Sequence, residues 1–210
     1  MLAISASSRH LTTRCSKPRG AGEPATIQVS SDESLLGAIA AGDRPSLQAL
    51  YSRHKVRVYR YALRLIGDAA TAEDITSEVF LEVWRQADTF KAKSQVSTWI
   101  LGVARYKALS AIRRRPKEPV DERAANMIAD DADDPEAMAE RQERGMIVRK
   151  CLSKLSVTHR EVLDLVYYHE KSVKEVARIV GVPESTVKTR MFYARKRMES
   201  MLETAGVSRQ

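Results

Sequence analysis

Residues 172–198 read SVKEVARIVGVPESTVKTRMFYARKRM, and their local signals predict two helices joined by a tight turn. Ser172 followed by Glu175 forms a capping box, which marks where the first helix begins. Gly181 can adopt the left-handed conformation that closes a helix, and Pro183 cannot continue it because it has no amide proton. Two apolar stripes have helical spacing: Val173, Val176, Ala177 and Val180, then Val187, Met191, Ala194 and Met198. The sequence therefore predicts a helix-turn-helix.

The opposite side of the second helix carries cations and hydrogen-bonding side chains. These are Lys188, Thr189, Phe192, Tyr193 and Lys196, flanked by Arg190, Arg195 and Arg197. Such a helix fits the major groove of DNA, with early residues at base edges and cations at phosphates. A basic helix can also be an ordinary solvated face, and Phe192 or, less so, Tyr193 could be a core aromatic. The cap, the turn and both stripes together favour nucleic-acid recognition.

Composition and charge predict two small all-α domains. The chain has 210 residues with only 9 Gly and 7 Pro, and it has no long alternating β-branched stretch. Two basic blocks are separated by an acidic segment, which suggests two polyanion-facing units on a tether. We expect a disordered basic tail (1–31), an N-terminal domain (32–115), a flexible acidic linker (116–139), a C-terminal helix-turn-helix domain (140–203) and a tail (204–210).

Apolar periodicity predicts further helices before the helix-turn-helix: 34–41, one from about Pro45 to Gly67, 71–87, 96–112, 136–155 and 156–169. The second of these carries a stripe of Arg53, Arg57, Arg60 and Arg64, which we interpret as a solvated face. Helix 71–87 gathers Glu73, Asp74, Glu78 and Glu82 on its exposed side, with Phe80 and Trp84 beside them. The two aromatics could lie in the core or complete a surface that binds a partner.

Several classes of protein are disfavoured. Cys15 and Cys151 imply no disulfide framework, which fits the reducing cytoplasm. The four histidines form no cluster with ligand spacing, so we expect neither a metal nor a cofactor. No apolar run is long enough to cross a bilayer, so we expect no membrane insertion. The dense acids of 130–134 lie in a Pro-bounded linker, which argues against an enzyme.

Two blocks of sequence resemble a known family. AEDITSEVFLEVWRQADTF with STWILGVARYKALSAIRRR, and then LDLVYYHEKSVKEVARIVGVPESTVKTRMFYARKRM, closely resemble the extracytoplasmic-function (ECF) group of bacterial sigma factors. The resemblance covers about residues 35–115 and 140–202, in the family's order. It implies a dissociable promoter-specificity subunit that binds bacterial core RNA polymerase and promoter DNA. It also implies a stress-responsive role, commonly under an anti-sigma factor, at the nucleoid in the cytoplasm.

The resemblance assigns roles to particular residues. Asp74, Glu78, Phe80 and Trp84 would bind core polymerase. Contacts to −10 DNA would come from Lys91, Lys93, Ser94, Gln95, Trp99, Arg105, Lys107 and Arg113. Contacts to −35 DNA would come from Ser185, Thr186, Lys188, Thr189, Arg190, Phe192, Tyr193, Arg195, Lys196 and Arg197. The basic tail is a departure, because the family does not need it.

Two other functions remain to be weighed. A conventional helix-turn-helix regulator that does not bind core polymerase would explain residues 172–198 equally well. It would leave the acidic helix and the loop of lysines before Trp99 without a role. An enzyme such as a recombinase would need a nucleophile or a carboxylate cluster, and the sequence offers no convincing one.

Overall fold

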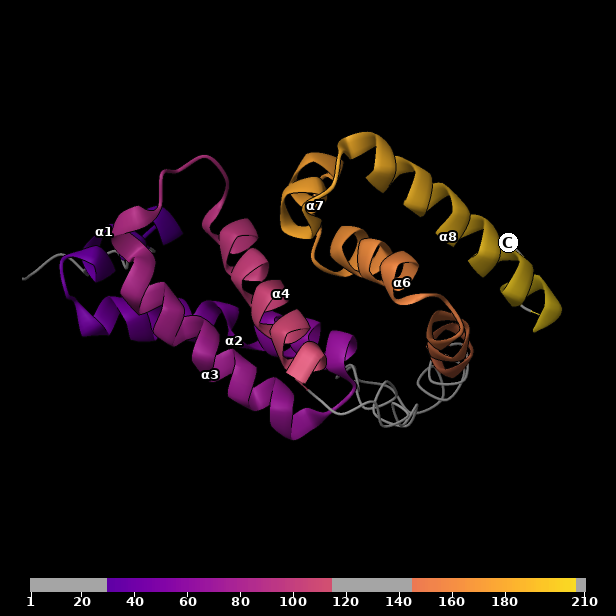
Figure 1. The fold of residues 1–210 in the computed structure, drawn as a ribbon, viewed down its shortest axis with the longest axis horizontal. Coiled ribbons are helices and arrows are strands. Elements are labelled where there is room, and N and C mark those ends of the chain that lie inside the picture. Colours follow the sequence, from indigo (N-terminus) through magenta and orange to yellow (C-terminus); the bar gives the residue numbers. More distant parts are fainter. Residues whose placement is uncertain (1–29, 115–144, 207–210) are drawn as a thin grey trace, which may run out of the picture.

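The computed structural model describes residues 30–114 and 145–206, and helices are the only regular elements in these two segments. Figure 1 shows the helices in two groups, the N-terminal one from indigo to pink and the C-terminal one from orange to yellow. The predicted fold class, two small all-α domains, is confirmed. The expected linker (116–139), nearly all of the expected tail (1–31) and the start of the expected helix 136–155 lie outside the described residues.

The N-terminal domain consists of α1 (Asp32–Ala40), α2 (Arg44–Ile66), α3 (Ala69–Gln86), the 3-10 turn η1 (Ala87–Thr89) and α4 (Val96–Arg114). Side-chain caps fix the helix starts, because Ser31, Asp43 and Asp68 each accept a hydrogen bond from a backbone N–H three residues on. Gly67 ends α2 in the left-handed region at φ 75°. The long helices α2, α3 and α4 pack on one another.

The C-terminal domain consists of a helical segment at 145–153, α6 (Val157–Leu163), η3 (Asp164–Tyr168), α7 (Val173–Val180) and α8 (Glu184–Thr204). The predicted helix 156–169 is not uniform, since it widens after Leu163 into the π-helical turn η3. The N–H of His169 closes this turn by donating to the carbonyl of Asp164 at 3.1 Å. Turns of this type occur frequently at functional sites.

The predicted helix-turn-helix is confirmed as α7 and α8. The Ser172 hydroxyl accepts a hydrogen bond from the N–H of Glu175 at 3.3 Å, and the Glu175 carboxylate accepts one from the N–H of Ser172 at 3.0 Å. Gly181, at φ 73°, closes α7. Val176, Val187 and the rest of the two predicted apolar stripes are buried or half-buried. The local signals of the sequence therefore determine this motif.

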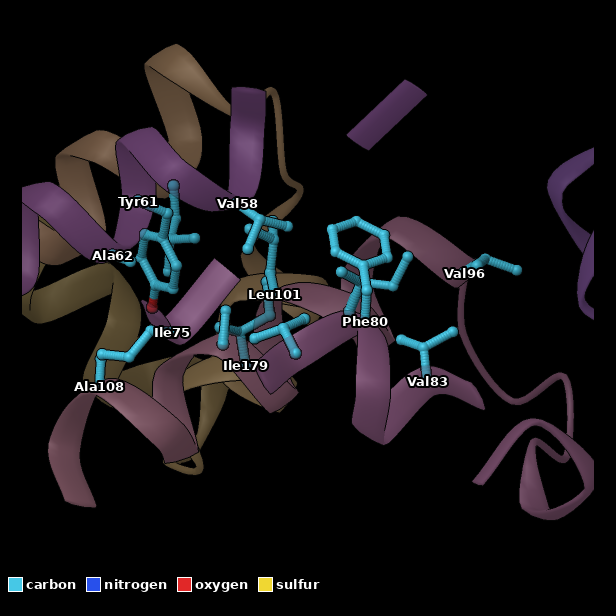
Figure 2. Close-up of a cluster of buried hydrophobic side chains, with 14 of the residues drawn as sticks. Val58, Tyr61, Ala62, Ile75, Phe80, Val83, Val96, Leu101, Ala108 and Ile179 are labelled. Carbon is cyan, nitrogen blue, oxygen red and sulfur yellow. The ribbon is translucent and has the colours of Figure 1, made fainter. Parts of the chain in front are cut away.

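One hydrophobic core runs through both domains. Figure 2 shows Ile179 of α7 among side chains of the N-terminal domain, including Leu101 and Tyr61. Leu165 and Val176 belong to the same buried cluster, and α7 packs against α4. The sequence predicts two units on a tether but does not predict that they pack together. In the structure they are in direct contact.

Candidate nucleic-acid and protein interfaces

The outward side of α8 presents the residues that the sequence predicts to meet duplex DNA. Val187, Met191 and Ala194 are buried beneath the helix and fix its orientation. Thr186 and Arg190 are half-buried. The exposed residues of the set are Ser185, Lys188, Thr189, Phe192, Tyr193, Arg195, Lys196 and Arg197. A rigid helix whose cations face solvent can enter a groove without rearrangement.

Phe192 and Tyr193 both lie on the surface of α8, which answers the question that the sequence left open. Phe192 is 61% exposed and Tyr193 is 56% exposed. Their rings meet edge to face, with centroids 5.4 Å apart. Leaving two large aromatic rings in water forgoes the free energy of burying them, so a surface pair of this kind marks a site of contact.

Tyr167 extends the surface of α8 onto a second element, and the sequence analysis does not include it. This residue of η3 is 63% exposed, and the guanidinium of Arg195 lies 5.5 Å from the centre of its ring. The cation–π contact holds the side chain of Arg195 on α8 against η3 of the same domain. Sequence periodicity shows only that Tyr167 lies near the end of a helix, and the arginine is too distant in sequence for a local pattern to pair them.

Helix α3 presents an acidic surface with an apolar residue inside it. Asp74 and Glu78 are exposed, and Leu81, which is 55% exposed, follows them on the same face of the helix. Trp84 is half-buried beside the core. Acidic and apolar side chains together suit a basic protein partner better than a nucleic acid. Leu81 is absent from the sequence-based set because it lies off the inward stripe.

Phe80 does not lie on this surface, so its predicted contact with a partner needs correction. Its side chain is 4% exposed, and its ring packs edge to face on Tyr51 with centroids 4.8 Å apart. Phe80 therefore supports α3 from within the core. The i, i+4 spacing to Trp84 does not show which of two adjacent aromatics points inward, and only the packing of α2 on α3 decides it.

Lys107, a predicted −10 contact, forms ion pairs with two acids of α3 in the structure. Its ammonium lies 3.4 Å from a carboxylate oxygen of Glu78 and 3.3 Å from one of Glu82. Hydrogen bonds from Lys107 and then from Gln86 lower the pKa of Glu82. Lys107 thus turns toward α3 and is occupied within the N-terminal domain. These ion pairs connect α4 with α3.

The loop between η1 and α4 brings two lysines close to an aromatic ring. Lys91 and Lys93 are exposed, and Ala92 between them has φ 50°, which produces a sharp turn. Ser94 is half-buried and Gln95 is exposed. Trp99 is half-buried, with its ring 5.4 Å from that of Phe90. Cations together with a partly exposed aromatic ring are the chemistry that binds single-stranded nucleic acid.

Arg105 is held by the C-terminal domain in the structure. Its Nε donates to the Glu161 carboxylate of α6 at 2.8 Å, and the hydroxyl of Tyr61 donates to the same carboxylate at 2.9 Å. Burial, followed by the negative charge of Glu161, raises the pKa of Tyr61 well above its usual range. Arg113, the last of the predicted −10 contacts, is exposed at the end of α4.

Two other kinds of site can be addressed in the described segments. Among residues 30–114 and 145–206, no group of His, Cys, Asp and Glu side chains could hold a metal ion. None of the helices described there is long and apolar enough to cross a bilayer. Cys151 is a free, buried thiol.

Comparison with protein families matches both domains. Residues 50–118 match the model of sigma-70 region 2, and residues 145–198 match that of sigma-70 region 4. The ECF RNA polymerase sigma factor SigL of Mycobacterium tuberculosis is 30% identical over 171 residues, which are 81% of this chain and 96% of SigL. The ECF RNA polymerase sigma factor SigK of Mycobacterium bovis is 32% identical over 184 residues, which are 85% of this chain and 97% of SigK.

Solved structures show the same fold. CnrH in complex with the cytosolic domain of CnrY aligns with a TM-score of 0.62 and 22% identity, covering 83% of this chain and 99% of CnrH. The sigma factor RpoE of Bartonella quintana in complex with the anti-sigma factor NepR aligns with a TM-score of 0.53 and 24% identity, covering 71% of this chain and 91% of RpoE. The chain matches both sigma-70 regions in their order, and it matches the two ECF relatives over nearly their whole length. It therefore belongs to the ECF group of RNA polymerase sigma factors.

Proposed function

We propose that this chain binds core RNA polymerase and directs it to promoters by recognising the −10 and −35 elements. The observation that carries the proposal is the presence of three chemically distinct surfaces on the two matched domains. One is acidic and apolar (α3), one combines lysines with Trp99, and one combines cations with an aromatic pair (α8). Three surfaces suit a protein that must bind polymerase, unpaired DNA and duplex DNA together.

The α8 surface is the proposed reader of the −35 duplex. Lys188 and Thr189 lie early on the helix and can reach base edges in the major groove. Arg195, Lys196 and Arg197 lie further along and can neutralise phosphates. Phe192 and Tyr193, between the two groups, can contact sugar and thymine methyl groups.

The loop of lysines with Trp99 is the proposed site for the unpaired −10 strand. Lys91 and Lys93 supply positive charge, Ser94 and Gln95 supply hydrogen bonds, and the half-buried Trp99 supplies an aromatic ring for stacking. Arg113 continues the positive charge along α4. Arg105 joins this surface only if the C-terminal domain releases it, since Glu161 holds it in the structure.

The acidic surface of α3 is the proposed site for core polymerase. Asp74 and Glu78 would pair with cations of the polymerase, and Leu81 and the exposed part of Trp84 would supply apolar contact. We further propose that an anti-sigma factor controls the chain in a stress response, in the bacterial cytoplasm at the nucleoid. Support comes from RpoE, which is solved with its anti-sigma factor.

Association with core polymerase tests this proposal against a conventional helix-turn-helix regulator. The chain should elute with purified core polymerase in gel filtration, and an excess of a known ECF sigma factor should displace it. A regulator would bind duplex DNA but elute apart from core. That result would contradict the proposed function.

A further inference from the structure

Carboxylates of the C-terminal domain accept most of the polar contacts that side chains of the N-terminal domain donate across the boundary. Glu161 accepts hydrogen bonds from Arg105 at 2.8 Å and from Tyr61 at 2.9 Å. Asp164 forms an ion pair with Arg64. Glu175 accepts a hydrogen bond from the hydroxyl of Thr98 at 2.6 Å. Acids of α6, η3 and α7 thus meet donors of α2 and α4.

The burial of these acids shows that they are suited to this contact. Glu161 is 5% exposed, and Asp164 is also buried. A buried carboxylate is destabilising unless a cation or a hydrogen-bond donor compensates its charge. Here the compensating groups come from the other domain. The ring of Tyr168 adds to the contact, because the guanidinium of Arg64 lies 4.0 Å from its centre and Arg60 donates to its hydroxyl.

The contact overlaps the proposed −10 surface and leaves the −35 surface free. Arg105 is not the only predicted −10 residue in this contact. Gln95 accepts a hydrogen bond from the ammonium of Lys171 at 3.2 Å. The backbone carbonyl of Lys93 accepts one from Arg178 of α7. In the same structure Lys188 of α8 is exposed. The C-terminal domain therefore engages Arg105, Gln95 and the Lys93 carbonyl of the proposed −10 surface, while its own DNA-binding residues remain accessible.

A carboxylate and a phosphate make the same charge-assisted hydrogen bonds to a guanidinium, so they compete for it. We call the arrangement in which the two domains are in contact the closed arrangement. It cannot bind both promoter elements at once, because their centres are about 25 base pairs, or roughly 85 Å of duplex, apart. The sequence has 30 residues between 114 and 145, and an extended chain of that length reaches about 100 Å. Simultaneous binding of the −10 and −35 elements by one chain therefore calls for the domains to separate.

We propose that Glu161 and Asp164 occupy an arginine surface, formed by Arg60, Arg64 and Arg105, whose alternative partner is the phosphate backbone of promoter DNA. The closed arrangement is then autoinhibited for −10 DNA, and domain separation exposes the arginine surface. This inference rests on the proposed function, because only a −10-binding domain can be inhibited in this way. It adds a DNA contact at Arg60 and Arg64 and an intramolecular competitor for it.

The test combines a distance measurement with a binding measurement in the full chain. A donor and an acceptor dye are attached at Ser52→Cys in α2 and Ser200→Cys in α8, both exposed positions, with Cys15→Ser and Cys151→Ala removing the native thiols. Binding is measured by fluorescence anisotropy with a mixed-sequence single-stranded DNA about 20 nucleotides long. Glu161→Gln is compared with Glu203→Gln, an exposed site near the end of α8 that changes the net charge equally.

Glu161→Gln should lower energy transfer and strengthen binding of the single strand by about fivefold or more, because the buried pair with Arg105 is lost. Glu203→Gln should change energy transfer little and binding less than twofold. Equal effects of the two variants would overturn the proposal. So would reduced energy transfer with unchanged affinity, since the contact would then exist without inhibiting DNA binding.

Two further variants keep the test decisive. Arg178→Ala removes an exposed side chain that donates across the boundary, so the variant should keep its fold. It should weaken closure and raise the affinity for the single strand, although it removes a cation. Glu161→Gln with Arg64→Ala and Arg60→Ala should lose the gain in affinity, and a retained gain would contradict the DNA contact. Failure of the chain to elute with core polymerase in gel filtration would refute the proposed function separately. Energy transfer reports domain closure in the absence of core polymerase, so the two failures can be distinguished.

Discussion

Lys188 and Arg195 lie on the same helix but should affect DNA binding in different ways, because base edges carry sequence information and phosphates do not. Lys188 is exposed early on α8 and can donate to guanine acceptors. Lys188→Ala should cost about 1–3 kcal/mol at the preferred −35 sequence and relax the preference at one or two base pairs. Binding of the full chain to single-base variants of a −35 duplex measures both effects.

Arg195→Ala provides the comparison. Its guanidinium rests over Tyr167, two turns beyond Lys188. The variant should weaken all −35 duplexes about equally and reduce the slope of affinity against salt by about one counterion. If Lys188→Ala weakens all sequences uniformly while Arg195→Ala changes base preference, the helix enters the groove in another register than the one proposed here.

Trp99 should act on unpaired DNA. Its ring packs on that of Phe90 and the residue is only half-buried, so we expect it to stack on an unpaired base. Trp99→Ala should reduce transcription from duplex promoters more than about tenfold and should regain most activity on templates that are already melted. Circular dichroism establishes that the variant folds. Equal losses on duplex and melted templates would argue against stacking.

His169 makes stability depend on pH. Burial, then the charges of Arg64, Arg57 and Lys171, lower its pKa from 6.5 to about 3, although Asp164 lies 3.5 Å from its Nε2. The folded protein therefore keeps the ring neutral while the unfolded chain binds a proton. Its stabilising effect is complete above the ordinary pKa of 6.5 and decreases as the pH falls from there toward 3.

Between about pH 7.5 and pH 5.5, His169 should lower the free energy of unfolding by about 1 kcal/mol. Urea denaturation at the two pH values measures this change. His169→Gln cannot take up the proton, so its pH dependence should be smaller by about that amount. An unchanged pH dependence would show that another group is responsible.

At the scale of elements, α3 carries the surface that we propose to bind core polymerase. Reversal of Asp74 and Glu78 to Lys should weaken binding to core polymerase by about tenfold or more, because opposite charges become like charges. Binding to a −35 duplex should stay the same, since α8 lies in the other domain. Equal core affinity of the double variant, measured by fluorescence titration, would disprove the assignment of α3.

Most elements could be predicted from the sequence because their determinants are local. The capping box at Ser172, the cap at Asp43 and the glycines after α2 and α7 act within one helical turn, and they fix the ends of these helices. The π-helical turn η3 could not be predicted, since its apolar residues keep nearly helical spacing. Periodicity does not resolve which neighbouring helix a side chain meets, so it predicts Phe80 on the partner-binding surface although its ring packs on Tyr51 of α2.

At the scale of the whole molecule, local sequence patterns do not predict the contact between the domains. Its pairs, such as Arg105 with Glu161 and Thr98 with Glu175, join residues far apart in the chain. The arginine stripe of α2 is polar, so its periodicity predicts a solvated face. In the structure Arg60 and Arg64 of that stripe face η3. Charge complementarity across the boundary becomes visible only when both domains are placed.

This chain is proposed to determine which promoters core RNA polymerase transcribes. Run-off transcription on a library of promoter fragments, with purified core polymerase in the presence and absence of the chain, tests it most directly. We expect transcripts only when the chain is present, starting downstream of one shared pair of −10 and −35 sequences. Lys188→Ala should weaken that preference at −35. Transcripts that are independent of the chain, or that start without a shared pair of elements, would contradict the claim.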